Sequence, residues 1–289
     1  MTPPPAGERI DLHTHSSASD GTEQPAELVA AAVQAGLTTM ALTDHDTTDG
    51  WAEGEQAARR LGIALVPGVE ISTSVSGTSI HLLGYLIDPA YAPLVEQLEA
   101  AVGSRTNRLE RMIARLEAGG VPVTLESVRA QTRPGATPGR PHIADALVAA
   151  GYVKDRDEAF AGVLHSRGPY YLPHYTIDVY EAVRLVHAAG GVPVMAHPFA
   201  SRRGRIVDDE VVERMVEAGL AGIEAHHRDH DDAEVQRALR LAREHDLVVT
   251  GSSDYHGEGK PNRLGENTTA PESLQRIEAL ATSGTHVVR

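Results

Sequence analysis

Histidine and carboxylic acid residues recur at short spacings along this 289-residue chain. His13 and His15 lie two residues apart, as do Asp254 and His256, so the members of each pair would leave an extended strand on the same face. Single residues of the same types stand between the pairs: Asp20, His45, Glu70, His81 and His197. The chain has no cysteine, so thiolate ligation of a metal is excluded. We predict that these nine residues bind divalent metal ions.

Clustering of these residues would be costly without cations. One histidine at a strand end is more often a capping residue than a ligand, but several carboxylates in one desolvated site repel each other. Divalent metals remove that cost, and mixed imidazole and carboxylate ligands suit Mn²⁺, Fe²⁺ or Zn²⁺ better than Mg²⁺. A hydroxide shared by two metals is a strong nucleophile at neutral pH. We therefore predict a metal-dependent hydrolytic site in which Glu70 and Asp254 are catalytic because they position these metals.

The elements that must position these residues are strands that alternate with helices, as in βα architectures. Short apolar runs predict strands at residues 9–12, 38–42, 64–69, 80–86, 192–196, 222–225 and 247–250. Nearly all candidate ligands come at or just after the carboxyl end of one of these strands. Glu70 is expected to end the third strand and His81 to open the fourth. The βα loops of a barrel converge at that end, so the ligands should meet there.

The middle of the chain has a helical pattern instead. Apolar residues from Leu94 to Leu116 predict a long helix that ends at Gly119 and Gly120. Shorter helical patterns follow at residues 124–131, 141–150 and 155–164, and we expect no strand between residues 88 and 190. We therefore predict a βα scaffold formed by residues 1–103 and 167–289, with residues 104–166 as a helical insertion that caps the substrate.

The motifs of the cluster resemble, in order and type, those of the PHP (polymerase and histidinol phosphatase) family. They are Asp11-Leu12-His13-Thr14-His15-Ser16, Ser19-Asp20-Gly21, Leu42-Thr43-Asp44-His45-Asp46, Pro67-Gly68-Val69-Glu70, Ala196-His197-Pro198 and Ser253-Asp254-Tyr255-His256. The chain most resembles the branch whose helical insertion bears Gly139-Arg140-Pro141-His142. That branch includes nucleoside 3′,5′-bisphosphate phosphatases that also act as 5′-to-3′ exoribonucleases on short RNA. Asp20, where some relatives have histidine, favours this branch over histidinol phosphatases.

The resemblance implies a fold class, a metal content and a set of ligands. The fold would be α/β, a distorted seven-stranded (β/α)7 barrel with a helical insertion domain, and the cofactors would be two to three divalent metal ions. Three ligand sets are implied: His13, His15, Glu70 and Asp254; Glu70, His81 and His197, with Glu70 bridging; and Asp20, His45 and His256. Asp44 is expected to orient a ligand rather than to bind metal.

Several residues are candidates for contact with the substrate. Arg140 and His142 open a predicted helix, where a guanidinium and backbone N–H groups favour phosphate, although an arginine–carboxylate pair within the insertion explains Arg140 equally well. Arg203 belongs to a run of arginines that either reaches a phosphate or forms a solvated loop. His227 follows the sixth strand and either protonates the leaving oxygen or supports a ligand. We select the first three as substrate-binding residues and His227 as a catalytic residue.

Composition limits the partners. The net charge of −14 repels polyanions, so we expect no duplex DNA, whereas a small phosphorylated substrate or short RNA can bind where metals or arginines reverse the field. Neither a signal peptide nor a membrane span is expected, and the lack of cysteine is compatible with the cytoplasm, which we predict as the location. The sequence does not indicate an oligomeric state.

We conclude that the chain hydrolyses a phosphate ester of a small substrate. The best candidates are a nucleoside 3′,5′-bisphosphate, from which the 3′-phosphate is removed, and the 5′ end of short RNA. The first alternative is a phosphatase of another small metabolite such as histidinol phosphate. The second is a non-catalytic, metal-stabilised PHP module, against which the complete set of ligands counts.

Overall fold

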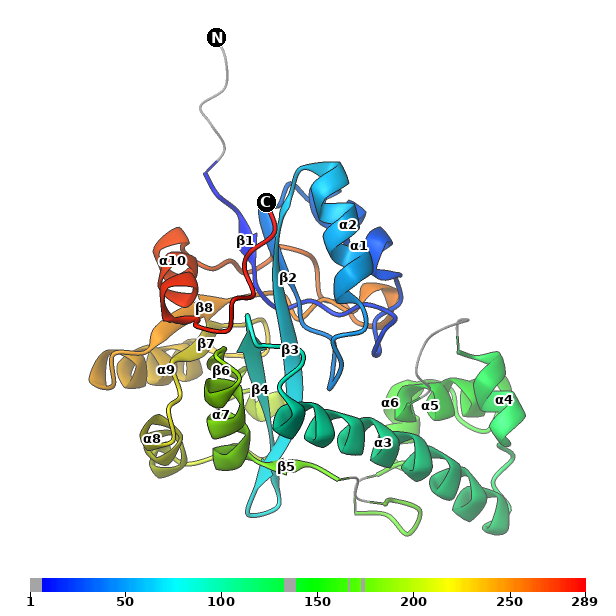
Figure 1. The fold of residues 1–289 in the computed structure, drawn as a ribbon. Helices are drawn as coiled ribbons and strands as arrows, with labels where there is room; N and C mark the ends of the chain where they lie inside the picture. The colour runs from blue at the N-terminus through cyan, green and yellow to red at the C-terminus, as the bar shows by residue number, and fades with distance from the viewer. Residues whose placement is uncertain (1–6, 133–138, 166, 173–174) are drawn as a thin grey trace. The chain divides into compact units, whose positions relative to one another are not determined.

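The structure is a computed structural model that describes residues 7–132, 139–165, 167–172 and 175–289 (Figure 1). The first six residues, part of the region where we expect no signal peptide, lie outside the described residues. The chain divides into two compact units: a barrel unit of Met1–Leu98 and Thr176–Arg289, and a helical unit of Glu99–Tyr175. Among the described residues, no helix combines the length and the hydropathy that a membrane span requires.

The barrel unit is built on one sheet of eight strands. They are β1 (Ile10–Asp11), β2 (Thr39–Leu42), β3 (Ala64–Val75), β4 (Thr78–Tyr85), β5 (Ile177–Asp178), β6 (Val192–Ala196), β7 (Gly222–His226) and β8 (Val248–Gly251). Seven of them run in the order β1-β2-β3-β4-β6-β7-β8, and β5 pairs with β3. A bridge between Thr14, after β1, and Tyr255, after β8, joins the two edges. The result is a nearly closed seven-stranded barrel, which confirms the predicted fold class.

The centre of the sheet departs from a purely parallel barrel. Strand β4 is antiparallel to both β3 and β6, whereas the other neighbours in the barrel are parallel. Strands β3 and β4 form a hairpin whose turn residues, Ser76 and Gly77, have φ values of 47° and 76°. Glu70 and His81 therefore lie inside their strands, and the prediction that they end and open strands is wrong. The residues after Glu70 keep pairing because the hairpin continues the ladder.

Strand β5 contradicts the prediction of no strand between residues 88 and 190. It pairs Ile177 and Asp178 with Thr73 and Ser74, in the part of β3 that extends toward the hairpin turn. Two residues are too few to produce a periodic pattern, so the strand depends on a partner that sequence periodicity does not identify.

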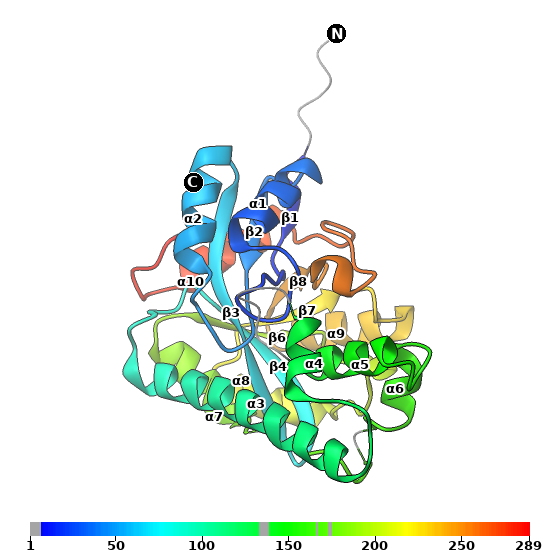
Figure 2. The same cartoon turned by 90° about the vertical axis from the view of Figure 1, so that its right-hand side faces the viewer.

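Helices pack on the outside of this sheet (Figures 1 and 2). They are α1 (Pro25–Gln34), α2 (Trp51–Leu61), α7 (Val179–Ala188), α8 (Asp209–Glu217), α9 (Asp232–Glu244) and α10 (Pro271–Leu280), with the 3₁₀ helices η1 (Ser201–Arg203) and η2 (Gly257–Gly259). Local signals start several of them: Asp178 accepts hydrogen bonds from the first turn of α7, and Pro25 opens α1. Their apolar faces and the outer face of the sheet form the main core.

A second apolar cluster includes inward-facing strand residues. Leu83 and Tyr85 belong to it and share one face of β4 with His81, because side chains alternate along a strand. Val66 belongs to it and shares a face of β3 with Glu70 in the same way. The inward face thus carries apolar residues at one end and His81 and Glu70 toward the other.

The helical unit has a core of its own. Helix α3 (Ala92–Ala118) runs into it from the barrel unit, and α4 (Leu125–Ala130), α5 (Arg140–Ala149) and α6 (Arg156–Ala161) follow. Leu109, Met112, Ile113 and Leu116 of α3 are buried at helical spacing and belong to one cluster with apolar residues of α4, α5 and α6.

Candidate metal centre

The structure gathers all nine predicted metal ligands around Glu70, within the barrel unit. His13, His15 and Asp20 follow β1, His45 follows β2, Glu70 lies in β3, His81 in β4, His197 follows β6, and Asp254 and His256 follow β8. Seven of them have side chains that are at most 10% exposed; Asp20 and His81 are 37% and 27% exposed. The closed sheet is what brings these separate segments to one rim of the barrel.

The Glu70 carboxylate stands between two sets of imidazole nitrogens. Its Oε2 faces three of them, at 3.3 Å from His13 Nε2, 3.2 Å from His15 Nε2 and 3.0 Å from His45 Nδ1. Its Oε1 faces two others, at 2.7 Å from His81 Nδ1 and 3.1 Å from His197 Nε2. A carboxylate that presents each oxygen to a different set of ligands can bridge two cations.

Three groups of ligand atoms have members that all lie within 4.8 Å of one another. They are His13, His15, Glu70 and Asp254; His15, Asp20, His45 and His256; and His45, Glu70 and His81. The first group equals one set that the resemblance implies. In the other two, His15 joins the set around Asp20, and His45 stands where the resemblance implies His197.

The donor atoms fit divalent metals. His13 Nε2, His15 Nε2 and Glu70 Oε2 are buried, and none makes a hydrogen bond of normal geometry to any described residue. Burial alone would raise the pKa of Glu70, but the imidazoles of His45, His81 and His13 hold that pKa well below its usual range. Lone pairs that converge without hydrogen bonds are the arrangement that metal coordination needs.

Asp44 holds the loop that carries His15 and Asp20. Its Oδ1 accepts hydrogen bonds from the Ser16 backbone N–H at 2.8 Å and from the Ser19 hydroxyl at 2.6 Å, and its Oδ2 accepts from the Ser16 hydroxyl at 2.7 Å. Both oxygens are thus used within the protein, and Asp44 belongs to none of the three ligand groups. It is placed to orient neighbouring ligands.

Asp11, which sequence reasoning did not select, holds the segment before Asp254 in the same manner. Its Oδ1 accepts a hydrogen bond from Ser253 N–H at 3.0 Å, and its Oδ2 accepts one from Gly265 N–H at 2.8 Å. Burial raises the pKa of Asp11 to about 6, against the hydrogen bonds from Ser253 and Gly265, which lower it. Its place at the end of β1, next to the ligand motif, was the available signal.

Glu224 is a second residue that sequence reasoning missed. It lies in β7, is fully buried, and contacts His13 Nδ1 through Oε1 at 3.1 Å. Burial raises the pKa of Glu224, but His13 outweighs this effect and holds the pKa below its usual range. A carboxylate inside the apolar run Gly222–His226 was a signal for a buried polar role.

Two cationic side chains approach the outer oxygen of Asp254. Arg203 Nη2 lies 2.5 Å from Asp254 Oδ2, and Arg203 Nε lies 2.5 Å from Asp229 Oδ2. Lys260 Nζ lies 3.6 Å from the same Asp254 oxygen and 3.0 Å from His256 Nε2. Arg203 is therefore at the metal centre rather than in a purely solvated loop, and its side chain is 30% exposed.

His227 also lies close to Asp254 and Arg203, whereas its neighbour His226 is exposed. His227 Nε2 lies 3.7 Å from Asp254 Oδ2 and 3.4 Å from Arg203 Nη2. Its Nδ1 accepts a hydrogen bond from the Asp229 backbone N–H at 3.0 Å. Nε2 is therefore the ring nitrogen of His227 that faces the ligand groups.

Arg140 and His142 lie in the helical unit, at the start of α5. Arg140 Nη2 donates a hydrogen bond to the Leu164 carbonyl, and the guanidinium lies over the ring of Tyr171 at 5.3 Å. Within the described residues Arg140 forms no ion pair with a carboxylate. His142 Nδ1 accepts a hydrogen bond from Gly139 N–H at 2.9 Å and so caps the helix.

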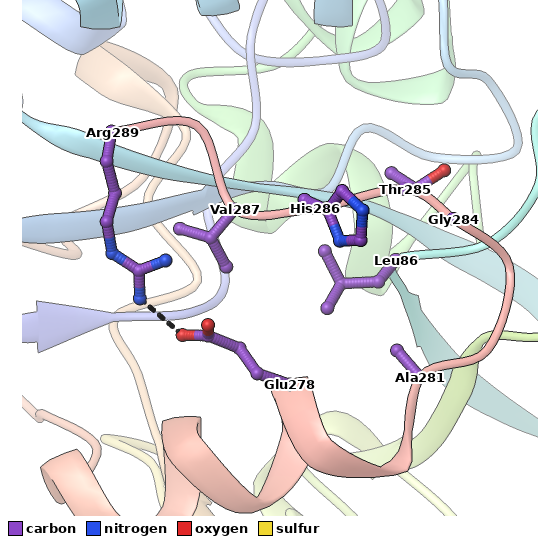
Figure 3. Close-up of a pocket in the computed structure, with 8 residues that line it drawn as sticks. All are labelled: Leu86, Glu278, Ala281, Gly284, Thr285, His286, Val287 and Arg289. Atoms are coloured by element: carbon purple, nitrogen blue, oxygen red, sulfur yellow. Dashed lines mark hydrogen bonds and ion pairs between the residues drawn. The ribbon is translucent and has the colours of Figure 1, made fainter.

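A hollow of about 250 Å³ lies elsewhere in the barrel unit (Figure 3). It is lined by Leu86 and by the C-terminal segment, where Glu278 pairs with Arg289 at 2.6 Å. Leu86 follows β4 directly, five residues after His81, so the backbones of these two residues are roughly 17 Å apart at the usual strand rise. The hollow is separate from the metal centre.

Comparisons with known proteins agree with this geometry. The PHP domain family matches residues 11–122. The chain is 34% identical over 254 residues to a 3′,5′-nucleoside bisphosphate phosphatase of Chromobacterium violaceum, covering 88% of this chain and 89% of the relative. It is 33% identical over 267 residues to a 5′-3′ exoribonuclease of Haemophilus influenzae, covering 92% and 96%. A solved structure from Bifidobacterium adolescentis, described as a metal-dependent phosphoesterase, matches with a TM-score of 0.90 and 39% identity over 96% of this chain and 98% of that one. The chain therefore belongs to the PHP family, and it is a metal-dependent phosphoesterase.

Proposed function

We propose that this phosphoesterase removes the 3′-phosphate of a nucleoside 3′,5′-bisphosphate, and that it also acts on the 5′ end of short RNA in the cytoplasm. Two relatives that match most of the chain are named a 3′,5′-nucleoside bisphosphate phosphatase and a 5′-3′ exoribonuclease, which supports this proposal. The observation that carries the proposal is Arg140, a guanidinium that is only partly exposed and forms no ion pair with a carboxylate among the described residues. Such a group is a ready partner for a second phosphate.

In this proposal the residues of the metal centre have different roles in the reaction. Bound Mn²⁺, Fe²⁺ or Zn²⁺ would supply an activated water and neutralise the charge of the phosphate. Glu70 and Asp254 would bind these ions and fix their positions relative to each other. Arg203 would bind oxygens of the reacting phosphate, because it already lies against Asp254 at the edge of the ligand groups.

His227 would give a proton to the leaving ribose oxygen. Its Nε2 lies 3.7 Å from Asp254 Oδ2 and 3.4 Å from Arg203 Nη2, which supports a role of this nitrogen at the reacting phosphate. A general acid must carry its proton on the atom that faces the leaving group, and Nε2 is the nitrogen of His227 on the side of the ligand groups.

Arg140 and His142 would recognise the phosphate that is not cleaved. Arg108, another guanidinium without a carboxylate partner among the described residues, lies 4.9 Å from the ring of Tyr171, which Arg140 also contacts. Two guanidinium groups that have no carboxylate partner among the described residues therefore lie beside one aromatic ring of the helical unit. Helix α5 adds backbone N–H groups at its start, next to Arg140.

A phosphate-release screen with added Mn²⁺ tests the assignment. It compares adenosine 3′,5′-bisphosphate, adenosine 3′- and 5′-monophosphates, short 5′-phosphorylated RNA, histidinol phosphate and p-nitrophenyl phosphate. We expect the highest kcat/KM with the bisphosphate or the RNA. A highest value with histidinol phosphate would contradict the substrate assignment and favour the small-metabolite alternative.

A further inference from the structure

Glu224 stands outside the three ligand groups, yet it touches two of the predicted ligands. Its Oε1 lies 3.1 Å from His13 Nδ1 and also accepts the Ser252 hydroxyl. Its Oε2 accepts a hydrogen bond from the His197 backbone N–H at 2.7 Å. Both carboxylate oxygens of Glu224 contact other protein groups, so its role is to support neighbouring residues.

We propose that Glu224 is a positioning residue of the metal centre that fixes the tautomer and ring orientation of His13 and the backbone of His197. The two ring nitrogens of His13 face different partners. Nδ1 faces Glu224, whereas Nε2 faces Glu70 Oε2 at 3.3 Å and Asp254 Oδ1 at 3.6 Å. A carboxylate at Nδ1 keeps the proton there, which leaves the lone pair of Nε2 for a cation.

The second contact acts on backbone conformation. His197 has a φ of 27°, in a region that residues other than glycine rarely adopt. This conformation carries its imidazole to 3.1 Å from Glu70 Oε1. His197 N–H donates a charge-assisted hydrogen bond to the Glu224 carboxylate, and such bonds are stronger than those between neutral groups. This bond stabilises the conformation of His197.

The sheet explains why one residue can serve both ligands. Strand β7 lies between β6, which His197 follows, and β8, where Glu224 pairs with Thr250. The pairing of β7 with β8 shifts register between Glu224 and His226, which marks an irregularity at this point. Glu224 therefore projects from the strand beside His197 toward His13.

The first test uses the wild-type chain loaded with Zn²⁺ and labelled with ¹⁵N-histidine. NMR should show the His13 proton on Nδ1 and zinc on Nε2. A proton on Nε2, or zinc on Nδ1, would overturn the assignment. This measurement needs no variant, so it remains decisive if substitution of Glu224 prevents folding.

The second test is Glu224→Gln, which keeps the shape but removes the charge and one acceptor. Competition with a chromophoric chelator should show Zn²⁺ affinity reduced by roughly tenfold to a hundredfold, as for other residues that support metal ligands. The matched control is Glu278→Gln, which breaks the pair with Arg289 in the separate hollow and should leave Zn²⁺ affinity unchanged. A folded Glu224→Gln variant with wild-type affinity would overturn the role of Glu224. Neither result bears on the substrate, because both readouts are independent of turnover.

Discussion

Arg203 Nη2 lies 2.5 Å from Asp254 Oδ2, while the other oxygen of the same carboxylate, Oδ1, lies 3.3 Å from His15 Nε2. Asp254 thus joins the ligand groups on one side to a guanidinium on the other. We expect the guanidinium to bind a phosphate that reaches the metals, since Arg203 is 30% exposed and so accessible from solvent.

Arg203→Ala should therefore lower kcat/KM for every phosphate ester, including p-nitrophenyl phosphate. Loss of one charge-assisted contact corresponds to roughly 1.5–3 kcal/mol, about tenfold to a hundredfold in rate. Steady-state kinetics check this, with Arg202→Ala, at an exposed neighbouring position, as the control. If both variants keep wild-type kinetics, Arg203 does not bind the reacting phosphate.

Arg140→Ala should act on one class of substrate only. A bisphosphate loses a contact that p-nitrophenyl phosphate never makes, so its kcat/KM should fall by about tenfold to a hundredfold while the monoester is nearly unaffected. Lys154→Ala removes an exposed positive charge from the same unit and serves as the control. Equal losses on both substrates would mean that Arg140 supports the fold through its contacts with Leu164 and Tyr171.

His227→Gln should separate substrates by their leaving group. An alkoxide such as a ribose oxygen needs a proton as it departs, whereas p-nitrophenolate departs without one. We expect a loss of roughly a hundredfold on nucleotides, within the usual range for general acids, and a much smaller loss on p-nitrophenyl phosphate. A uniform loss would instead assign His227 to support of Asp254.

The stability of the metal-free protein should depend on His15. Burial lowers the pKa of His15, but Asp254 and Glu70 outweigh burial and raise it to about 9. The imidazolium then stabilises the fold fully below its ordinary pKa of 6.5, and this contribution is lost as the pH rises through about 9. The change amounts to about 3 kcal/mol.

Urea unfolding with a chelator present, at pH 6 and again above pH 9, measures this change in the free energy of unfolding. His15→Asn should show the smaller decrease with pH, because it cannot be protonated. Parallel decreases in the wild type and the variant would contradict the assigned charge of His15.

The sequence predicted strands that alternate with helices because each strand is a short apolar run, and the resemblance to the PHP family implied that these strands form a barrel. It could not predict the direction of β4, since an apolar run looks the same in either direction. For that reason Glu70 and His81, which sit on a hairpin, were placed at strand ends. Periodicity also cannot reveal β5, which consists of two residues.

Prediction of the site from the sequence is limited in a similar way. Residue type and spacing single out nine residues that the structure gathers, but the groups that they form depend on distances between side chains. His45, for example, lies 3.0 Å from Glu70 Oε2, which no spacing along the chain indicates. Glu224 was missed because a single carboxylate in an apolar strand has no motif; only its contacts with His13 and His197 reveal its role.

Metal analysis of the purified chain tests the central claim most directly. After reconstitution with Mn²⁺, Fe²⁺ or Zn²⁺ and removal of free ions, mass spectrometry of the metals should give two to three equivalents per chain. Glu70→Gln should hold at least one fewer, because Glu70 faces five imidazoles with its two oxygens. Less than one equivalent in the wild type under all three conditions would contradict a metal-dependent phosphoesterase built on this cluster.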